Sequence, residues 1–203
     1  MGGQAPDRIS VAAARRSHSA RRESARSLRS LLCMGHDGTL NVVLTGFMGT
    51  GKTTVGRILA DRLGCGFVDT DEVIESRAGP IHEIFERDGE EAFRDMERSV
   101  ARELADRRGL VIATGGRMML DGECAACLEP TAEVFCLTAG PNIVIERIGD
   151  TAGRPLLAGR DASERVRELL EERAEGYARF ASVDTEGRSP DEVADAVMSL
   201  LGL

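Results

Sequence analysis

The chain of 203 residues has a formal net charge of −8, and 42% of its residues are hydrophobic. This length suits one α/β domain with or without a tail, and the apolar content is enough to bury a core. The acidic balance argues against a general nucleic-acid binder, and no apolar run approaches the roughly 18 residues of a membrane-spanning helix.

The first part of the chain, residues 1–39, is a basic extension rich in arginine and serine. Residues 1–33 carry a charge of +5, so the rest of the chain must carry −13 to give the total of −8. The segment lacks the apolar stretch of a secretory signal and resembles an Arg- and Ser-rich transit peptide. An organellar presequence, a disordered basic tail and upstream sequence read from an early start codon are the alternatives, and we favour the last two. We therefore expect a disordered extension over 1–39 and a single domain over 40–203.

A glycine-rich motif, G-x-x-x-x-G-K-T, occupies residues 46–53. Residues 40–45 before it are β-branched and apolar, as in a buried parallel strand, and residues 54–63 after it have a helical apolar spacing. A glycine loop between a strand and a helix N-terminus is typical of a phosphate-binding P-loop, which makes a chance glycine-rich turn the weaker interpretation. Lys52 can then reach the β- and γ-phosphates, and the Thr53 hydroxyl can bind Mg²⁺.

Strand-like and helix-like segments alternate after this loop. Short buried strands are expected to end near Val68 and to occupy residues 110–114, 133–137 and 181–184. Helices are expected over residues 72–78, 81–87, 90–107, 143–148, 162–179 and 190–201. A loop with glycines and a proline, residues 150–161, is expected to be mobile. This α/β pattern predicts three layers around a five-stranded parallel sheet, with ligands at the carboxyl ends of its strands.

Polar residues and glycines follow two of the predicted strands. Asp69 and Asp71 stand after the second strand, and Gly115 and Gly116 follow the third. A P-loop needs a carboxylate near its metal, which Asp69 is placed to supply. Asp71 has a simpler alternative, because aspartate is a common helix cap.

Arginines in the helices and in the loop 150–161 are the other candidates. Arg94 and Glu97 have the spacing that puts two side chains on one helix face, although an exposed pair of this kind has little energetic weight. Arg154 lies in the loop, and Arg173 and Tyr177 lie on the late helix. Most arginines in so charged a helix are solvated, so the position of Arg173 alone indicates no function.

The five cysteines are odd in number and follow no signal-peptide region, which indicates reduced thiols in the cytoplasm. Cys124 and Cys127 form a single C-x-x-C without the second ligand pair of a structural zinc site. We interpret both as small hydrophobic residues in or near a helix.

Taken together, the motifs resemble those of the shikimate kinases, within the nucleoside-monophosphate-kinase-like P-loop group. The resemblance extends from about residue 41 to the C-terminus. Its motifs are GFMGTGKTTVG, FVDTD, IFERDGEEAFRDMER, TGG, RPLL in a lid, and ERAEGYARFA. It implies transfer of a phosphoryl group from ATP to the 3-hydroxyl of shikimate, in aromatic amino-acid synthesis. It also implies a monomer that uses Mg²⁺. The thiols indicate the cytoplasm, and the net charge and the lack of a long apolar run argue against nucleic acid or membrane as a partner.

On the nucleotide side, the resemblance implies that Lys52 and the lid residue Arg154 are catalytic cations. Thr53 would bind Mg²⁺ directly, Asp69 would bind it through water, and Arg147 would stack on adenine. The implied ATP-binding residues are Gly46, Gly49, Thr50, Gly51, Lys52, Thr53, Thr54, Arg147, Arg154 and Arg188.

On the acceptor side, the resemblance implies that Asp71 is catalytic, either orienting or deprotonating the attacking hydroxyl. Arg94 and Arg173 would hold the substrate carboxylate, for which a guanidinium fork is the matching donor. The implied acceptor-binding residues are Asp71, Arg94, Gly115, Gly116 and Arg173, with Phe85 and Phe93 as apolar walls of the pocket.

One residue departs from the family pattern. Three successive glycines usually follow the third strand, and here Arg117 takes the third place. An inward Arg117 would clash with shikimate or add an anion contact, whereas an outward one would leave activity ordinary. Arg117 supports one alternative function, a related kinase with a changed acceptor, such as a gluconate-kinase-like enzyme. A second alternative is a shikimate-kinase-like module that senses a ligand; the basic residues 1–33 hint at it but are too short to form a DNA-binding domain.

Overall fold

A computed structural model describes residues 40–149 and 162–203, so the expected extension 1–39 and the expected loop 150–161 lie outside the described residues. The described chain contains a five-stranded sheet in the order β2-β3-β1-β4-β5, with every neighbouring pair parallel. The strands are β1 (Asn41–Thr45), β2 (Gly66–Asp69), β3 (Leu110–Ala113), β4 (Ala132–Thr138) and β5 (Ala181–Asp184). This confirms the predicted fold class.

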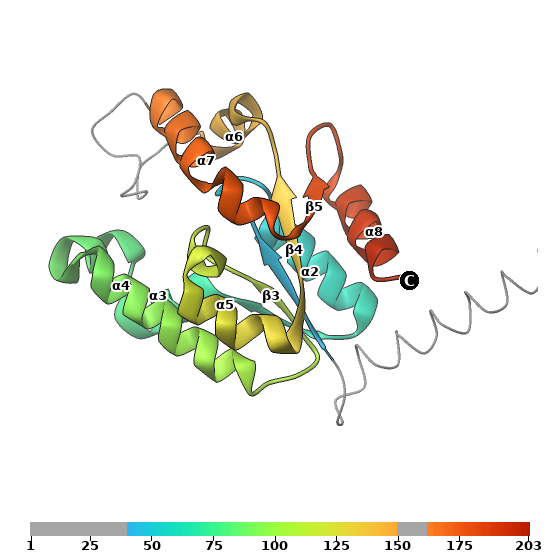
Figure 1. Ribbon diagram of the computed structural model, residues 1–203, viewed down its shortest axis with the longest axis horizontal. Coiled ribbons are helices and arrows are strands. Elements are labelled where there is room, and N and C mark those ends of the chain that lie inside the picture. Colours follow the sequence, from blue (N-terminus) through green and yellow to red (C-terminus); the bar gives the residue numbers. More distant parts are fainter. Residues whose placement is uncertain (1–39, 150–161) are drawn as a thin grey trace, which may run out of the picture.

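Helices connect the strands, as parallel pairing requires, and cover both faces of the sheet (Figure 1). They are α2 (Lys52–Leu63), α3 (Thr70–Ala78), α4 (Ile81–Ala105), α5 (Gly122–Leu128), α6 (Pro141–Ile148), α7 (Ala162–Ala178) and α8 (Pro190–Leu200). Two short 3₁₀ turns, η1 (Met118–Leu120) and η2 (Glu129–Thr131), flank α5.

The central strand β1 is buried along its whole length and serves two separate cores. Val42 and Leu44 pack against α2 and α8, which lie side by side on one face, whereas Val43 points to the core formed with α3, α4 and α5. A third cluster joins Phe47, just after β1, to α6 and α7. These apolar contacts anchor the start of the P-loop to α6 and α7.

The boundaries around β2 correct one interpretation of Asp71. α3 begins at Thr70, two residues earlier than predicted, because the Oδ1 atom of Asp69 accepts hydrogen bonds from the backbone N–H groups of Asp71 and Glu72, at 3.0 and 3.5 Å. Asp69 is therefore the cap, and the carboxylate of Asp71 is left for another role.

Two other helices differ from expectation. The predicted helices over 81–87 and 90–107 are one element, α4, interrupted at Gly89, whose φ of 84° only glycine adopts easily. α5 has no counterpart among the predicted helices and is capped by Asp121 through the N–H groups of Glu123 and Cys124. Cys124 is buried in α5 and Cys127 lies on the same helix, as the hydrophobic interpretation of the C-x-x-C expected.

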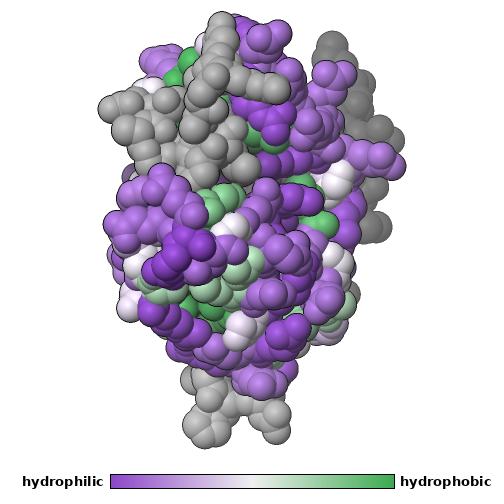
Figure 2. Space-filling view, turned by 90° about the vertical axis from the view of Figure 1, so that its left-hand side faces the viewer, coloured by the Kyte–Doolittle hydropathy of each residue, from purple (hydrophilic) through white to green (hydrophobic). Residues whose placement is uncertain are grey.

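The surface that carries α4 and α7 is mainly hydrophilic, and hydrophobic residues reach it only in small separate areas (Figure 2). Among the described residues, Leu40 and Leu200 are the large hydrophobic side chains that are exposed. No helix in the described ranges has the length and apolar character needed to span a bilayer.

Candidate active site

The candidate residues gather where the parallel strands end. The P-loop follows β1, Asp69 closes β2, Gly115 follows β3 and Thr185 follows β5. This is the edge of a parallel sheet at which ligands are expected.

The P-loop owes its shape to glycines with positive φ, which are Gly46 at 130°, Gly49 at 78° and Gly51 at 90°. A Cβ on Gly46 would lie 2.2 Å from the carbonyl oxygen of Leu137 in β4, so no other residue fits there. Gly51 is the N-cap of α2 and supplies no capping side chain. The first N–H groups of α2 are therefore directed at the loop, as in an anion site.

Lys52 and Thr50 hold the loop from within. The Nζ atom of Lys52 donates to the carbonyl oxygens of Gly46 and Phe47, both at 2.9 Å. The buried Thr50 hydroxyl donates to the same Phe47 oxygen at 2.8 Å. The ammonium group thus lies over the loop in which a phosphate chain would sit.

Thr53 and Asp69 meet beside the loop. The Thr53 hydroxyl donates to Oδ2 of Asp69 at 2.7 Å. Hydroxyl and carboxylate oxygens are ligands that suit Mg²⁺, which keeps several waters and uses few protein ligands. In the described ranges no three His, Cys, Asp or Glu side chains form a metal-binding group, so a small site completed by phosphates fits these residues better than a full protein cage.

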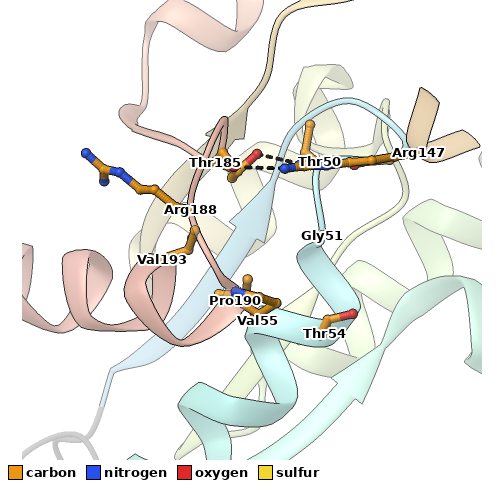
Figure 3. Close-up of a pocket in the computed structure, with 10 residues that line it drawn as sticks. Thr50, Gly51, Thr54, Val55, Arg147, Thr185, Arg188, Pro190 and Val193 are labelled. Carbon is orange, nitrogen blue, oxygen red and sulfur yellow. Dashed lines mark hydrogen bonds between the residues drawn. The ribbon is translucent and has the colours of Figure 1, made fainter. Parts of the chain in front are cut away.

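A pocket beside the P-loop is lined by two of the arginines implied to bind ATP, Arg147 and Arg188 (Figure 3). Its lining includes Arg147 on α6, whose Nη1 and Nη2 donate to the hydroxyl and carbonyl of Thr185, both at 2.8 Å. Arg188 extends away from Arg147 (Figure 3), and the apolar side chains of Val55 and Pro190 also line the pocket. The other lining residues are Gly49, Thr50, Gly51, Thr54 and Val193.

Arg94 and Glu97 are buried rather than an exposed helix pair, with 7% and 1% of their surfaces exposed. Nη1 of Arg94 donates to Oε2 of Glu97 at 2.7 Å, while Nε and Nη2 donate to Oε1 of Glu90 at 3.2 and 2.8 Å. A guanidinium has five N–H donors, so each terminal nitrogen keeps one N–H for another acceptor. This leaves the fork geometry that binds a carboxylate.

Two buried carboxylate oxygens face the loop after β3. Oδ1 of Asp71 and Oε1 of Glu97 have no hydrogen-bond partner in the described structure. They lie 2.8 and 2.6 Å from the place a Cβ on Gly115 would occupy, so they are at most 5.4 Å apart. Burial and the neighbouring Asp69 raise the pKa of Asp71 to about 6. Burial also raises the pKa of Glu97 to about 7, against the lowering effect of Arg94.

Arg173 reaches the same region from α7. It is 8% exposed and its guanidinium carbon lies 5.4 Å from the centre of the Phe47 ring. No carboxylate of the described residues pairs with it, which is uncommon for a buried cation. Its Nη1 lies 3.8 Å from the position of a Cβ on Gly116. A buried cation beside a glycine loop is an attractive site for an anionic ligand.

Arg117 points outward to the surface. Its side chain is 54% exposed, and Nη1 lies 3.0 Å from Oε1 of Glu90, the oxygen that also binds Arg94. Arg117 therefore touches the candidate acceptor site only through the carboxylate of Glu90. Phe85 and Phe93, the predicted apolar walls, pack together with ring centres 5.1 Å apart.

The structure brings together residues that the sequence analysis left without a role. The hydroxyl of Thr70 accepts from the N–H of Gly115, and the carboxylate of Glu90 accepts from Arg94. The hydroxyl of Thr185 accepts from Arg147. Glu90 had a detectable signal, because it stands four residues before Arg94 on one helix. The two threonines had none. Arg154 lies outside the described residues.

Comparisons with known proteins agree on one family. The family model described as shikimate kinase (SKI) matches residues 48–201. A shikimate kinase from Thermodesulfovibrio yellowstonii is 44% identical over 160 residues, covering 78% of this chain and 92% of that protein. A solved shikimate kinase from Acinetobacter baumannii, in complex with shikimate, has a TM-score of 0.78 at 33% identity and covers 87% of this chain and 96% of that one. A gluconokinase from Sinorhizobium meliloti 1021, at 20% identity and a TM-score of 0.56, shares the fold only.

Proposed function

The chain belongs to the shikimate kinase family, and we propose that the site described above transfers the γ-phosphoryl group of ATP to the 3-hydroxyl of shikimate. One observation carries this proposal. Arg94 and Arg173 are buried beside the P-loop, and Arg94 keeps two N–H donors while Arg173 has no carboxylate partner among the described residues. A small ligand that carries a carboxylate and hydroxyl groups would supply hydrogen-bond acceptors for both arginines.

On the donor side, we propose that the P-loop N–H groups and Lys52 hold the phosphates, with the adenine in the pocket lined by Arg147, Val55 and Pro190. Thr53 would hold Mg²⁺ directly and Asp69 through water, and the ion when bound neutralises charge on the β- and γ-phosphates. The lid arginine, Arg154, is proposed as a further cation on the transferred group.

On the acceptor side, Arg94 and Arg173 would bind the carboxylate of shikimate and Asp71 would bind its hydroxyls. The 3-hydroxyl oxygen forms a bond to the γ-phosphorus as the bond from that phosphorus to the bridging oxygen breaks and ADP leaves. The free Oδ1 of Asp71 orients this hydroxyl and accepts its proton. Phosphoryl transfer depends mainly on such positioning, with charge supplied around the moving group.

Three further properties belong to the proposal. We propose a monomer, because the exposed large hydrophobic side chains of the described residues are only Leu40 and Leu200. A cytoplasmic location is supported by four cysteines without disulfides in the described ranges. Small-molecule substrates, with neither nucleic acid nor membrane as partner, fit the net charge of −8.

The test compares two acceptors and one variant. ADP release should depend on shikimate and not on gluconate, in a coupled assay with MgATP. Asp71→Asn should lower kcat by about 100-fold or more, because it removes the proton acceptor, while the Kd for ATP stays within about twofold. Asp95→Asn, an exposed position on α4, is the matched control and should behave as the parent.

If the parent enzyme releases no ADP in response to shikimate, phosphorylation of shikimate is excluded. Turnover with gluconate and not with shikimate would instead support a gluconate-kinase-like enzyme. A near-normal kcat in Asp71→Asn would contradict the catalytic role of Asp71, and the identification of the acceptor would still stand.

A further inference from the structure

The loop after β3 is held by side chains from two helices. The N–H group of Gly115 donates to the hydroxyl of Thr70, at the start of α3, at 2.9 Å. The carbonyl oxygen of Gly116 accepts a hydrogen bond from the hydroxyl of Tyr177 on α7. Within the loop, the N–H group of Met118 closes a turn onto the carbonyl of Gly115 at 3.1 Å. Among the described residues, the N–H groups of Gly116 and Arg117 have no acceptor.

Tyr177 is built into the core at the junction of the two substrate sites. It is 7% exposed and belongs to the cluster that contains Phe47 of the P-loop and Val144 of α6. One helical turn before it on α7 lies Arg173, which lies beside the same Gly116. Burial raises the pKa of the Tyr177 hydroxyl to about 12, so it is a hydrogen-bond donor at every working pH.

The hydrogen bond from Tyr177 also fixes the orientation of the N–H group of Arg117. A trans peptide is planar, and its carbonyl and N–H groups point in opposite directions. The carbonyl of Gly116 and the N–H of Arg117 belong to one peptide, so holding the carbonyl toward α7 turns the N–H away from α7. Glycine alone would not impose this orientation, because its backbone has access to a wide range of φ and ψ.

We propose that Tyr177 is a positioning residue for acceptor binding: its hydroxyl fixes the Gly116–Arg117 peptide, so that the loop presents the N–H group of Arg117 to the anionic end of the acceptor. This inference rests on the proposed function for the identity of the acceptor. Tyr177 touches no reacting atom. Its hydroxyl contacts the carbonyl of Gly116 and also interacts with the guanidinium of Arg173, so it acts through the backbone of the loop and through that arginine. Because it lies on the helix that also carries Arg173, it sets the loop and the arginine in one fixed arrangement.

Tyr177→Phe removes the hydroxyl and keeps the ring. The carbonyl of Gly116 would lose its partner, and leaving such a buried group unsatisfied typically costs a factor of about 5 to 150 in an equilibrium constant. This penalty disfavours the ordered loop in the free enzyme, so the binding-competent fraction falls. The KM for shikimate should then rise at least about fivefold and at most by that factor, with the KM for ATP changed less than about twofold.

Two other variants separate positioning from general stability. Thr70→Val removes the other hydrogen bond to the loop, so it should also raise the KM for shikimate, and its effect should not add to that of Tyr177→Phe because both act on one loop. Val197→Ala on α8 lowers stability from the opposite face of the sheet and should leave the KM for shikimate unchanged.

An unchanged KM for shikimate in folded Tyr177→Phe would overturn the inference, as would equal rises in the KM for ATP and for shikimate. If Tyr177→Phe does not fold, an unchanged KM in Thr70→Val overturns it instead. A parent enzyme without shikimate-dependent activity would contradict the proposed function, and this result is separate from those on the variants.

Discussion

Glu97 carries a charge in a place that favours the neutral acid, and Glu97→Gln is predicted to stabilise the protein in a pH-dependent way. Its carboxyl is 1% exposed, and only Oε2 has a partner, Arg94 at 2.7 Å. Burial outweighs the attraction of Arg94 and raises the pKa from 4.5 to about 7. Glutamine keeps the size of the side chain and an oxygen that can accept from Arg94. Arg94 would also retain Glu90, so it is not left as an unpaired buried cation.

The sign of the effect follows from proton binding. Between pH 4.5 and about pH 7, the folded state holds a proton on Glu97 that the unfolded state has released, so stability falls as pH rises through this window. The difference between 4.5 and 7 corresponds to about 3 kcal/mol at pH 8. The neutral glutamine escapes this loss. At pH 5 only the first half unit of the window has been crossed, so the gain should shrink to about 0.7 kcal/mol.

The assay is urea denaturation followed by circular dichroism at pH 8 and pH 5, supported by thermal unfolding. A gain of about 3 kcal/mol should raise the Tm at pH 8 by about 6–12 °C for a chain of this length. Glu91→Gln is the matched control on the same helix, since its side chain is 77% exposed and the change should be within about 0.5 kcal/mol. A gain of equal size at both pH values, or a loss at pH 8, would refute the assignment of a destabilising charge to Glu97.

Two other substitutions test the loops on either side of the cleft. Arg117→Gly removes an exposed ion pair with Glu90 worth up to about 1 kcal/mol, so the KM for shikimate in steady-state assays should change less than about fivefold. A rise well beyond tenfold would contradict the outward orientation of Arg117. Gly46→Ala places a Cβ 2.2 Å from the Leu137 oxygen at a φ of 130°, and thermal unfolding should show a loss of more than about 2 kcal/mol. Gly122→Ala, which meets no atom within 4 Å, is its control, and equal losses in both would contradict the steric argument.

The sheet and the P-loop were predictable because each rests on local pattern. Buried parallel strands give continuous apolar runs, and the motif of residues 46–53 needs only its neighbours to be recognised. α5 was not predicted because only seven residues form it, too few for an apolar period, and its start depends on the cap supplied by Asp121.

The sequence predicted which residues form the candidate site, but it did not predict their burial or their contacts. Helical spacing placed Arg94 and Glu97 on one face, but only the packing of α4 against the sheet decides that this face is buried. The direction of Arg117 depends on Glu90, which lies 27 positions away in the sequence. The partners that hold the glycine loop, Thr70 and Tyr177, come from separate helices, and no spacing rule links them to Gly115 and Gly116.

Tyr177 also gives this protein a native optical reporter. The chain has one tyrosine and no tryptophan, so its ultraviolet emission comes almost entirely from a single ring. That ring lies between the P-loop cluster and the glycine loop, with its hydroxyl bonded to the backbone there. Tyrosine emission responds to the hydrogen bonding of the phenol. Substrate-induced rearrangement at the centre of the molecule can therefore be followed in real time in the unlabelled protein, without an engineered fluorophore.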